Sequence, residues 1–93
     1  MMTISEAAAA CGGELIHAEG CGGRTWLGGQ FDSRKVEDGN LFFAIKGNNT
    51  DGHNYVNKAF ELGAAAAVAE HDVEGALGPI ILVESSEKAI MAV

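Results

Sequence analysis

Proline and basic residues are scarce in this sequence, and the shortage of positive charge limits its partners. The chain has one proline, six lysines and arginines, and 13 aspartates and glutamates, which give a formal net charge of −7. This balance argues against a nucleic-acid binder, which needs a basic face, and against binding to an anionic membrane surface. It leaves room for a phosphorylated small molecule, because two or three local cations can hold a phosphate.

Cysteine and long apolar runs are also scarce. The two cysteines, Cys11 and Cys21, are too few for a disulfide framework, and their spacing fits no metal motif. We expect free thiols rather than a disulfide, because nothing in the chain indicates secretion. No apolar stretch is long enough to span a bilayer, and the first residues lack the basic segment and apolar core of a signal peptide. A cytoplasmic protein is therefore expected.

Apolar periodicity and turn signals predict an α/β fold in one small domain of 93 residues. The predicted helices lie at 4–11, 53–62 and 85–93, and the predicted strands lie at 14–17, 25–31, 41–45, 64–69 and 80–83. The run at 64–69 is mostly alanine, a poor strand former, but it is short and follows a helix stop. From residue 41 onward strands and helices alternate, so we predict a small mixed, partly parallel sheet flanked by about three helices.

Two of the predicted helices carry end signals. Thr3 and Glu6 have the spacing of a capping box before the first helix, which Gly12 would end. Asp51 and Gly63 stand where the N-cap and the glycine after the last turn of the second helix would stand. The helix at 53–62 is the best defined of the predicted helices, and 80–83 is the clearest predicted strand.

The densest group of polar and charged residues lies at 31–53. This stretch reads FDSRKVEDGNLFFAIKGNNTDGH and holds three of the six lysines and arginines, namely Arg34, Lys35 and Lys46. A buried strand is predicted in its middle, with a polar turn before it and a polar loop after it. Binding groups usually lie on loops held by a rigid scaffold, so we expect the two polar segments to converge on a ligand.

The polar turn is Asp32-Ser33-Arg34. Ser33 can offer a hydroxyl and Arg34 a planar fork suited to phosphate or carboxylate, while Asp32 can orient Arg34 or cap the turn. The same residues are also ordinary turn chemistry with a solvated arginine. Short polar motifs match by chance, so the residues alone favour the second interpretation.

The polar loop at 46–53 offers a second set of groups. Gly47 and Gly52 would let the backbone approach a ligand, and the start of the following helix would present free N–H groups to an anion. A flexible connecting loop with a helix cap explains these residues equally well. The chain contains no G-x-x-x-x-G-K-[ST] phosphate loop.

Histidine and aromatic residues give weaker signals. His17, His53 and His71 are far apart in sequence and lack partner cysteines, so no metal site is predicted. No Ser-His-Asp or Cys-His arrangement can be argued, and no catalytic residue is assigned. Most aromatic residues should lie in the core, although one near the polar segments could stack on a planar base.

Taken in order, the motifs resemble a known family. The chain is similar to the N-terminal domain of the Mur ligases in the order of four motifs. These are D-S-R, then D-G-N-L-F-F-A-I-K-G, then D-G-H, then a helix ending E-L-G-A-A-A-A-V. The opening ISEAAAACGGEL is most similar to the MurF type, which adds D-alanyl-D-alanine. The MurE type, which adds the third peptide residue, shares D-S-R and D-G-H. The resemblance covers nearly the whole chain.

The resemblance implies a cytoplasmic three-domain ligase of peptidoglycan synthesis that uses ATP and Mg²⁺. ATP would activate the carboxylate of UDP-N-acetylmuramoyl-tripeptide as an acyl phosphate, and the amine of D-alanyl-D-alanine would attack it. The family's G-K-T loop is absent here, so we expect this chain to hold no cofactor and to catalyse nothing alone. Residues 1–84 would bind the UDP precursor, and residues 85–93 would begin a helix leading to the central ATP-binding domain.

The resemblance also implies which residues hold UDP. Ser33 and Thr50 would donate hydrogen bonds. Arg34 and Lys46 would supply positive charge, while His53 would either contact the ligand or brace the loop and helix start. The full implied set is Ser33, Arg34, Lys46, Gly47, Asn49, Thr50, Asp51, Gly52 and His53.

Two other interpretations stay open. One keeps the domain but assigns it to the MurE type. The other is a small α/β interaction module without a ligand site, in which Arg34 is merely solvated. In either case the last predicted helix carries an apolar face with nothing after it to cover it, formed by Ala89, Ile90, Met91 and Val93. We therefore expect a piece of a longer protein that is prone to self-association.

Overall fold

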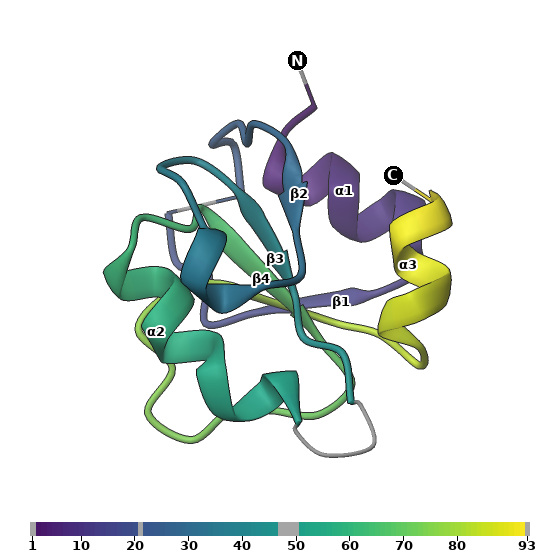
Figure 1. The fold of residues 1–93 in the computed structure, drawn as a ribbon. Coiled ribbons are helices and arrows are strands. Elements are labelled where there is room, and N and C mark those ends of the chain that lie inside the picture. Colours follow the sequence, from purple (N-terminus) through teal and green to yellow (C-terminus); the bar gives the residue numbers. More distant parts are fainter. Residues whose placement is uncertain (1, 21, 47–50, 93) are drawn as a thin grey trace.

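The computed structural model describes residues 2–20, 22–46 and 51–92, which build one five-stranded sheet with helices on both faces (Figure 1). The helices are α1 (Ile4–Cys11), α2 (Val56–Glu61) and α3 (Ser86–Ala92), with 3₁₀ helices η1 (Ser33–Lys35) and η2 (Gly52–Tyr55). The strands are β1 (Glu14–Ile16), β2 (Gly29–Gln30), β3 (Leu41–Phe43), β4 (Ala66–Ala69) and β5 (Ile80–Leu82). Within these residues no helix has the length and apolarity needed to cross a membrane.

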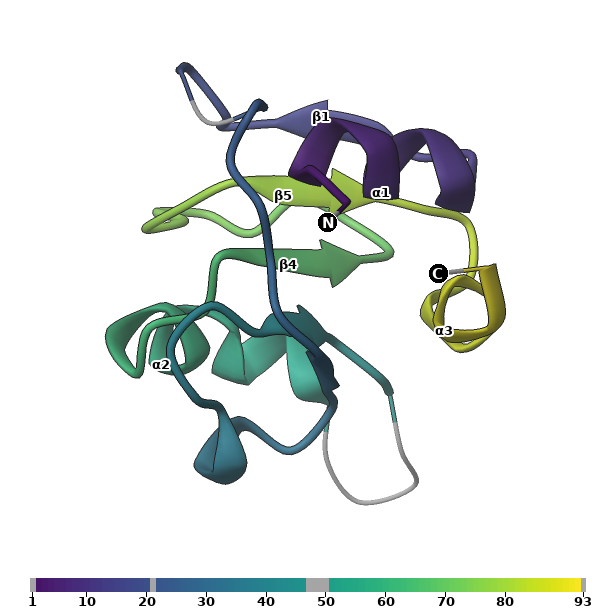
Figure 2. The same cartoon turned by 90° about the horizontal axis from the view of Figure 1, so that it is seen from above.

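The sheet is mixed, and most of its pairs are parallel. Its strand order is β1-β5-β4-β3-β2. Strands β2, β3, β4 and β5 pair in parallel, whereas β1 runs antiparallel to β5 at one edge. Figure 2 shows β1, β5 and β4 side by side from above. The predicted α/β class with a partly parallel sheet is therefore confirmed.

Two separate core clusters form because helices cover both faces of the sheet. Helices α1 and α3 lie on one face and α2 on the other (Figure 1). Along β3, Leu41 and Phe43 pack into the cluster under α1 and α3, while Phe42 packs into the cluster under α2. All three side chains are at most 3% exposed. A strand covered on both faces reads as a continuous apolar run, which is why the sequence predicted it.

The alanine run forms the central strand β4. All four of its residues, Ala66–Ala69, are fully buried. Its neighbours β3 and β5 bring large side chains, including Phe42, Ile80 and Ile81, so small residues between them leave room for the helices. Tertiary packing here overrides the low strand propensity of alanine.

Two predicted elements differ from the structure. The strand expected at 25–31 is reduced to β2, because Gly28 adopts the left-handed conformation with φ of +70° and turns the chain just before it. The helix expected at 53–62 is split, since its first turn is the 3₁₀ helix η2 and only Val56–Glu61 is α-helical. Strand β1 and helix α1 match their predictions closely.

The apolar face of α3 is only partly uncovered. Ala89 is 3% exposed and packs in the core with α1, which corrects the expectation that it would lie bare. Ile90 and Met91 are 41% and 89% exposed. Cys11 is a free thiol, as predicted, whereas Cys21 lies outside the described residues. Self-association through α3 stays a prediction.

Candidate functional site

A cavity of about 670 Å³ lies where the polar turn and the start of α2 meet. It is lined by Phe31, Asp32, Ser33, Arg34, Phe42, Ile45, Gly52, Tyr55 and Lys58. The turn follows β2 and Ile45 follows β3, so the cavity opens at the carboxyl ends of two parallel strands. Ligands of open α/β sheets bind at this edge.

The first wall of the cavity is the turn that begins at Asp32. Its carboxylate accepts the backbone N–H of Arg34 at 3.0 Å and so caps η1. The same carboxylate accepts two guanidinium bonds, from Nε and Nη2 of Arg34, both at 3.1 Å. The pKa of Asp32 is lowered mainly by these bonds, and the pKa of Arg34 is raised by the same partner. Asp32 therefore performs both predicted roles, since it caps the turn and orients Arg34.

The second wall is the start of η2, whose amides are already used. Gly52 N–H donates to the Ile45 carbonyl at 2.9 Å. His53 N–H donates to the Asp51 carboxylate at 3.0 Å, and Asn54 N–H donates to the Asp51 carbonyl at 3.0 Å. The expectation of free N–H groups for an anion at this helix start is therefore wrong for these three amides. The Asp51 side chain satisfies one of them because it is the N-cap that the sequence indicated.

Gly52 makes a close backbone approach, but to its own chain. A Cβ at this position would lie 2.7 Å from Ile45 N, 2.9 Å from Ile45 O and 3.1 Å from Ala44 Cα. The residue must be glycine because η2 is pressed against the exit of β3. Gly52 also lines the cavity, so this packing sets the shape of its floor.

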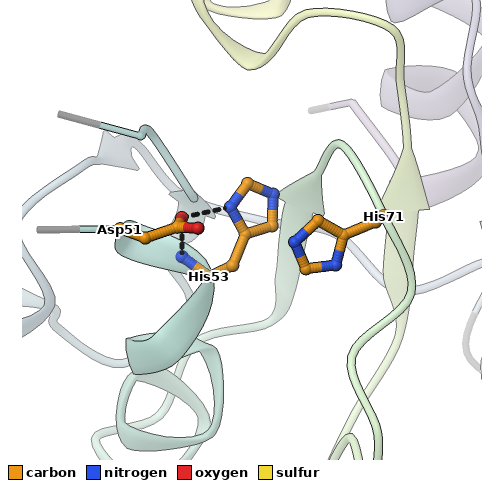
Figure 3. A group of neighbouring side chains, drawn as sticks. All are labelled: Asp51, His53 and His71. Atoms are coloured by element: carbon orange, nitrogen blue, oxygen red, sulfur yellow. Dashed lines mark hydrogen bonds and ion pairs between the residues drawn. The ribbon is translucent and has the colours of Figure 1, made fainter.

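His53 links the start of η2 to the end of β4 through hydrogen bonds of its ring. It is 6% exposed, and its ring bonds two partners in different segments. Nδ1 lies 2.6 Å from the Asp51 carboxylate (Figure 3), and Nε2 lies 2.8 Å from the backbone N of Glu70, the residue that follows β4. A backbone amide can only donate, so Nε2 is the unprotonated acceptor and Nδ1–H donates to Asp51. These contacts are those of a residue that braces the loop and the helix start.

Asp51, His53 and His71 also bring three potential metal ligands within 4.8 Å of one another. The two imidazole rings stack with centroids 4.1 Å apart (Figure 3). A metal-bound histidine normally donates its second N–H to an acceptor, but Nε2 of His53 faces the Glu70 amide, a donor. If Nδ1 bound a metal, Nε2 would carry the ring proton, and this N–H would face the N–H of Glu70, so that two donors would point at each other. The polarity of this cluster therefore suits the hydrogen-bonded brace and not a metal.

The structure divides the predicted site residues into three groups. Ser33, Arg34 and Gly52 line the cavity. Lys46, Asp51 and His53 do not line it; Lys46 and Asp51 pair as an isolated backbone bridge at the base of the loop. Gly47, Asn49 and Thr50 lie outside the described residues. Sequence reasoning missed Phe31, Tyr55 and Lys58 as lining residues.

Phe31, Tyr55 and Lys58 line the cavity because of where the end of β2 and the η2–α2 segment lie in the fold. Tyr55 and Lys58 are three positions apart, which places both on one side of the helical segment. Most aromatic residues were expected in the core, but Tyr55 is 42% exposed and Phe31 is 70% exposed. By contrast Phe42 and Phe43 are buried as expected. An exposed aromatic pair beside a polar turn offers planar surfaces for a base.

Three comparisons connect this arrangement to known proteins. The sequence profile of the Mur ligase family, catalytic domain, matches residues 28–91. The UDP-N-acetylmuramoyl-L-alanyl-D-glutamate--2,6-diaminopimelate ligase of Bacillus licheniformis is 44% identical over 61 residues, which are 66% of this chain and 12% of that protein. The ligase of the same name from Aquifex aeolicus is 48% identical over 59 residues, 63% of this chain and 12% of that protein.

Solved structures give a wider match. A crystal structure of MurF from Acinetobacter baumannii superposes with a TM-score of 0.83 at 25% identity, covering 97% of this chain and 19% of that one. MurF from Thermotoga maritima, in complex with ADP, superposes with a TM-score of 0.61 at 35% identity, covering 67% of this chain and 14% of that one. The chain thus spans less than a fifth of the length of each of these relatives.

Proposed function

The chain belongs to the Mur ligase family, and from that premise we propose that it is the domain that holds the UDP end of a UDP-N-acetylmuramoyl-peptide in an ATP-dependent peptidoglycan ligase. The observation that carries the proposal is the cavity at the carboxyl ends of β2 and β3, with Ser33 and Arg34 on its wall. The names of the curated relatives begin with UDP-N-acetylmuramoyl, and so does that of a solved neighbour. These names share the UDP-N-acetylmuramoyl group, and a domain present in both types of ligase would recognise that shared group.

The chemistry of the cavity suits a uridine nucleotide. The exposed rings of Phe31 and Tyr55 offer faces on which a planar base can stack. The Ser33 hydroxyl can donate to a ribose or phosphate oxygen, and Arg34 adds N–H donors at the rim. Lys46, Gly47, Asn49 and Thr50 stay predicted contacts from the loop that follows β3.

The finer proposal is a ligase of the MurF type, which adds D-alanyl-D-alanine to UDP-N-acetylmuramoyl-tripeptide. It is supported by the A. baumannii MurF structure, whose match extends over 97% of the chain. The alternative is the MurE type, favoured by curated relatives that are 44% and 48% identical over about two thirds of the chain. Turnover of the parent protein with D-alanyl-D-alanine or with 2,6-diaminopimelate as the amine separates the two, since each type should release phosphate with one amine only.

The remaining parts of the parent enzyme would carry the reaction. ATP with Mg²⁺ would phosphorylate the peptide carboxylate, and the amine nitrogen would then displace phosphate to form the new amide bond. We assign no catalytic residue and no cofactor to this chain, whose part is to bind and orient the substrate. The setting we propose is the cytoplasm, in the synthesis of the cell wall that maintains cell shape and permits division.

A binding titration tests the proposal. The ¹⁵N-labelled chain is titrated with UDP-N-acetylmuramoyl-tripeptide and, in parallel, with UDP while its amide spectrum is followed. We expect saturable shifts at Ser33, Arg34 and Tyr55, with no shifts in α1 on the opposite face. An interaction module without a ligand site predicts no saturable shift with either ligand, and that result would refute the proposal. Arg34→Ala should weaken binding if the site is real and change nothing if Arg34 is merely solvated.

A further inference from the structure

Two cationic side chains line the cavity, but one of them is already neutralised. The guanidinium of Arg34 forms two hydrogen bonds with Asp32, and that carboxylate lines the same cavity. The Asp32 carboxylate, 3.1 Å from the guanidinium, offsets much of the positive charge that Arg34 presents to a bound anion. Arg34 can thus orient an anion through its remaining N–H groups while adding little net charge.

The second cation, Lys58, is uncompensated. Among the residues that the structure describes, no acidic group forms an ion pair with Lys58. The titratable groups that line the cavity are Asp32, Arg34, Tyr55 and Lys58. The formal charges of Asp32, Arg34 and Lys58 sum to a single positive charge. Lys58 lies on α2, three positions after Tyr55, and both side chains line the same cavity as the Asp32 turn.

Three backbone amides at the start of η2 do not supply this positive charge instead. The amides of Gly52, His53 and Asn54, which face an anion in many helix starts, donate to Ile45 or Asp51. A diphosphate in the cavity therefore finds no free amide among these three, which favours a side chain as its charge partner. A lysine ammonium on a flexible stem is suited to this role as a mobile point charge.

We infer that Lys58, not Arg34, is the residue that compensates the diphosphate charge of the nucleotide, and that Arg34 acts as a positioning residue for that group. The inference rests on the proposed function, because it takes the ligand to be a nucleoside diphosphate. It differs from the assignment carried over from the family resemblance, which gave the charge to Arg34 and Lys46. It names a specificity determinant for the phosphate-bearing form of the ligand.

The test compares UDP with uridine, which lacks the phosphates. Binding of both is measured by NMR titration for the wild-type chain and for Lys58→Gln, Lys58→Arg and Lys88→Gln. Lys88 is the matched control, since it is an exposed lysine on α3, across the sheet from the cavity. We expect Lys58→Gln to lose about tenfold in UDP affinity, the size of one charge-assisted hydrogen bond, and to bind uridine as the wild type does. Lys58→Arg and Lys88→Gln should bind UDP within about twofold of the wild type.

Each outcome separates the inference from the proposed function. Lys58→Gln that binds UDP as tightly as the wild type overturns the inference while UDP binding stands. A wild-type chain that binds UDP no better than uridine overturns it as well. If the wild type binds neither ligand, the proposed function fails. A titration with inorganic pyrophosphate then decides whether Lys58 forms an anion site. A saturable shift of the Lys58 side-chain signals supports such a site, and no shift overturns it.

Discussion

The starts of α1 and of the η2–α2 segment are both capped by a polar side chain, but the two caps differ in what else they contact. Each begins with a polar side chain that accepts a backbone N–H from the first turn: Thr3 accepts from Glu6, and Asp51 accepts from His53. At α1 the reciprocal bond is local, since Glu6 accepts the N–H of Thr3 at 2.9 Å. At η2 the second bond runs through the His53 ring to Glu70, 17 residues away.

The difference shows which parts of the fold bear on the binding site. The side-chain bonds of the α1 cap are solvent-exposed and join residues only three apart, so their loss should act mainly at this helix end. The η2 start joins the loop after β3 to the end of β4, and it forms the floor of the cavity through Gly52. Disturbing the long-range brace should therefore cost both stability and ligand affinity, whereas disturbing the local cap should cost stability alone.

The largest expected effect comes from filling the contact between η2 and β3. Gly52→Ala would place a Cβ 2.7 Å from a backbone nitrogen that cannot move aside. We expect a loss of roughly 3 kcal/mol in the free energy of unfolding, from overpacking, together with weaker UDP binding. Urea denaturation measures the first and titration the second. Gly23→Ala, whose Cβ would meet nothing within 4 Å, is the control and should change little; equal losses at both glycines would contradict the argument.

Removal of the brace is expected to be next in size. His53→Ala removes a buried ring and leaves the N–H of Glu70, whose hydrogen bond is part-buried, without its acceptor; this should lower the free energy of unfolding by about 2 kcal/mol. Amide hydrogen exchange at Glu70 should accelerate in parallel. His71→Ala removes the stacked ring and its exposed hydrogen bond to the Asp72 carbonyl, and it should cost no more than about 0.5 kcal/mol. The brace is refuted if the two variants lose the same stability.

Loss of the local cap should be smaller. Thr3→Ala removes the acceptor for the Glu6 N–H and should lower the free energy of unfolding by about 1 kcal/mol. Thr3→Ser keeps the hydroxyl and should remain near the wild type. UDP affinity should be unchanged in both variants. A drop in UDP affinity for Thr3→Ala would show that the two helix starts are coupled after all.

Acid should produce the smallest effect, and with the same sign at both helix starts. The pKa of Glu6 is lowered from its ordinary 4.5 by the backbone and side-chain hydrogen bonds of Thr3, and that of Asp51 is lowered from 3.8 by those of His53. A carboxyl whose pKa is lower in the folded state stabilises the fold above its unfolded pKa, and this stabilisation is lost as pH falls through the folded pKa. Carboxyl ¹³C titration should find both groups below these ordinary values. A normal pKa at either residue would mean that its cap does not persist in solution.

Local signals explain what could be predicted from the sequence. The capping box at Thr3, the apolar strands and the glycine after α2 all depend on neighbours within a few residues, and the structure has each of them. The mixed, partly parallel sheet followed from the alternation of these elements. The residues at 31–53 were singled out because their polar types are dense there, and Ser33 and Arg34 do line a cavity.

What the sequence could not predict depends on contacts between distant segments. The bond from His53 to Glu70 and the exposure of Tyr55 appear only when α2 has docked on the sheet. Lys58 carried no motif and became a candidate because of its position on that docked helix. The free amides expected after Asp51 were used by Asp51 itself and by Ile45, a competition that residue types alone do not reveal.

The position of β1 has a consequence for the order in which the chain folds. Glu14 of β1 pairs with Leu82 of β5, so β1 can join the sheet only after β5 has been synthesised. The ribosome adds about 5–20 residues per second, so this edge stays open for several seconds after Glu14 has been synthesised. Such non-local pairing also slows folding in dilute solution, because a long loop must close first. We therefore expect the β2–β3–β4 part of the sheet to form earlier, and α1 to dock only as the final edge closes.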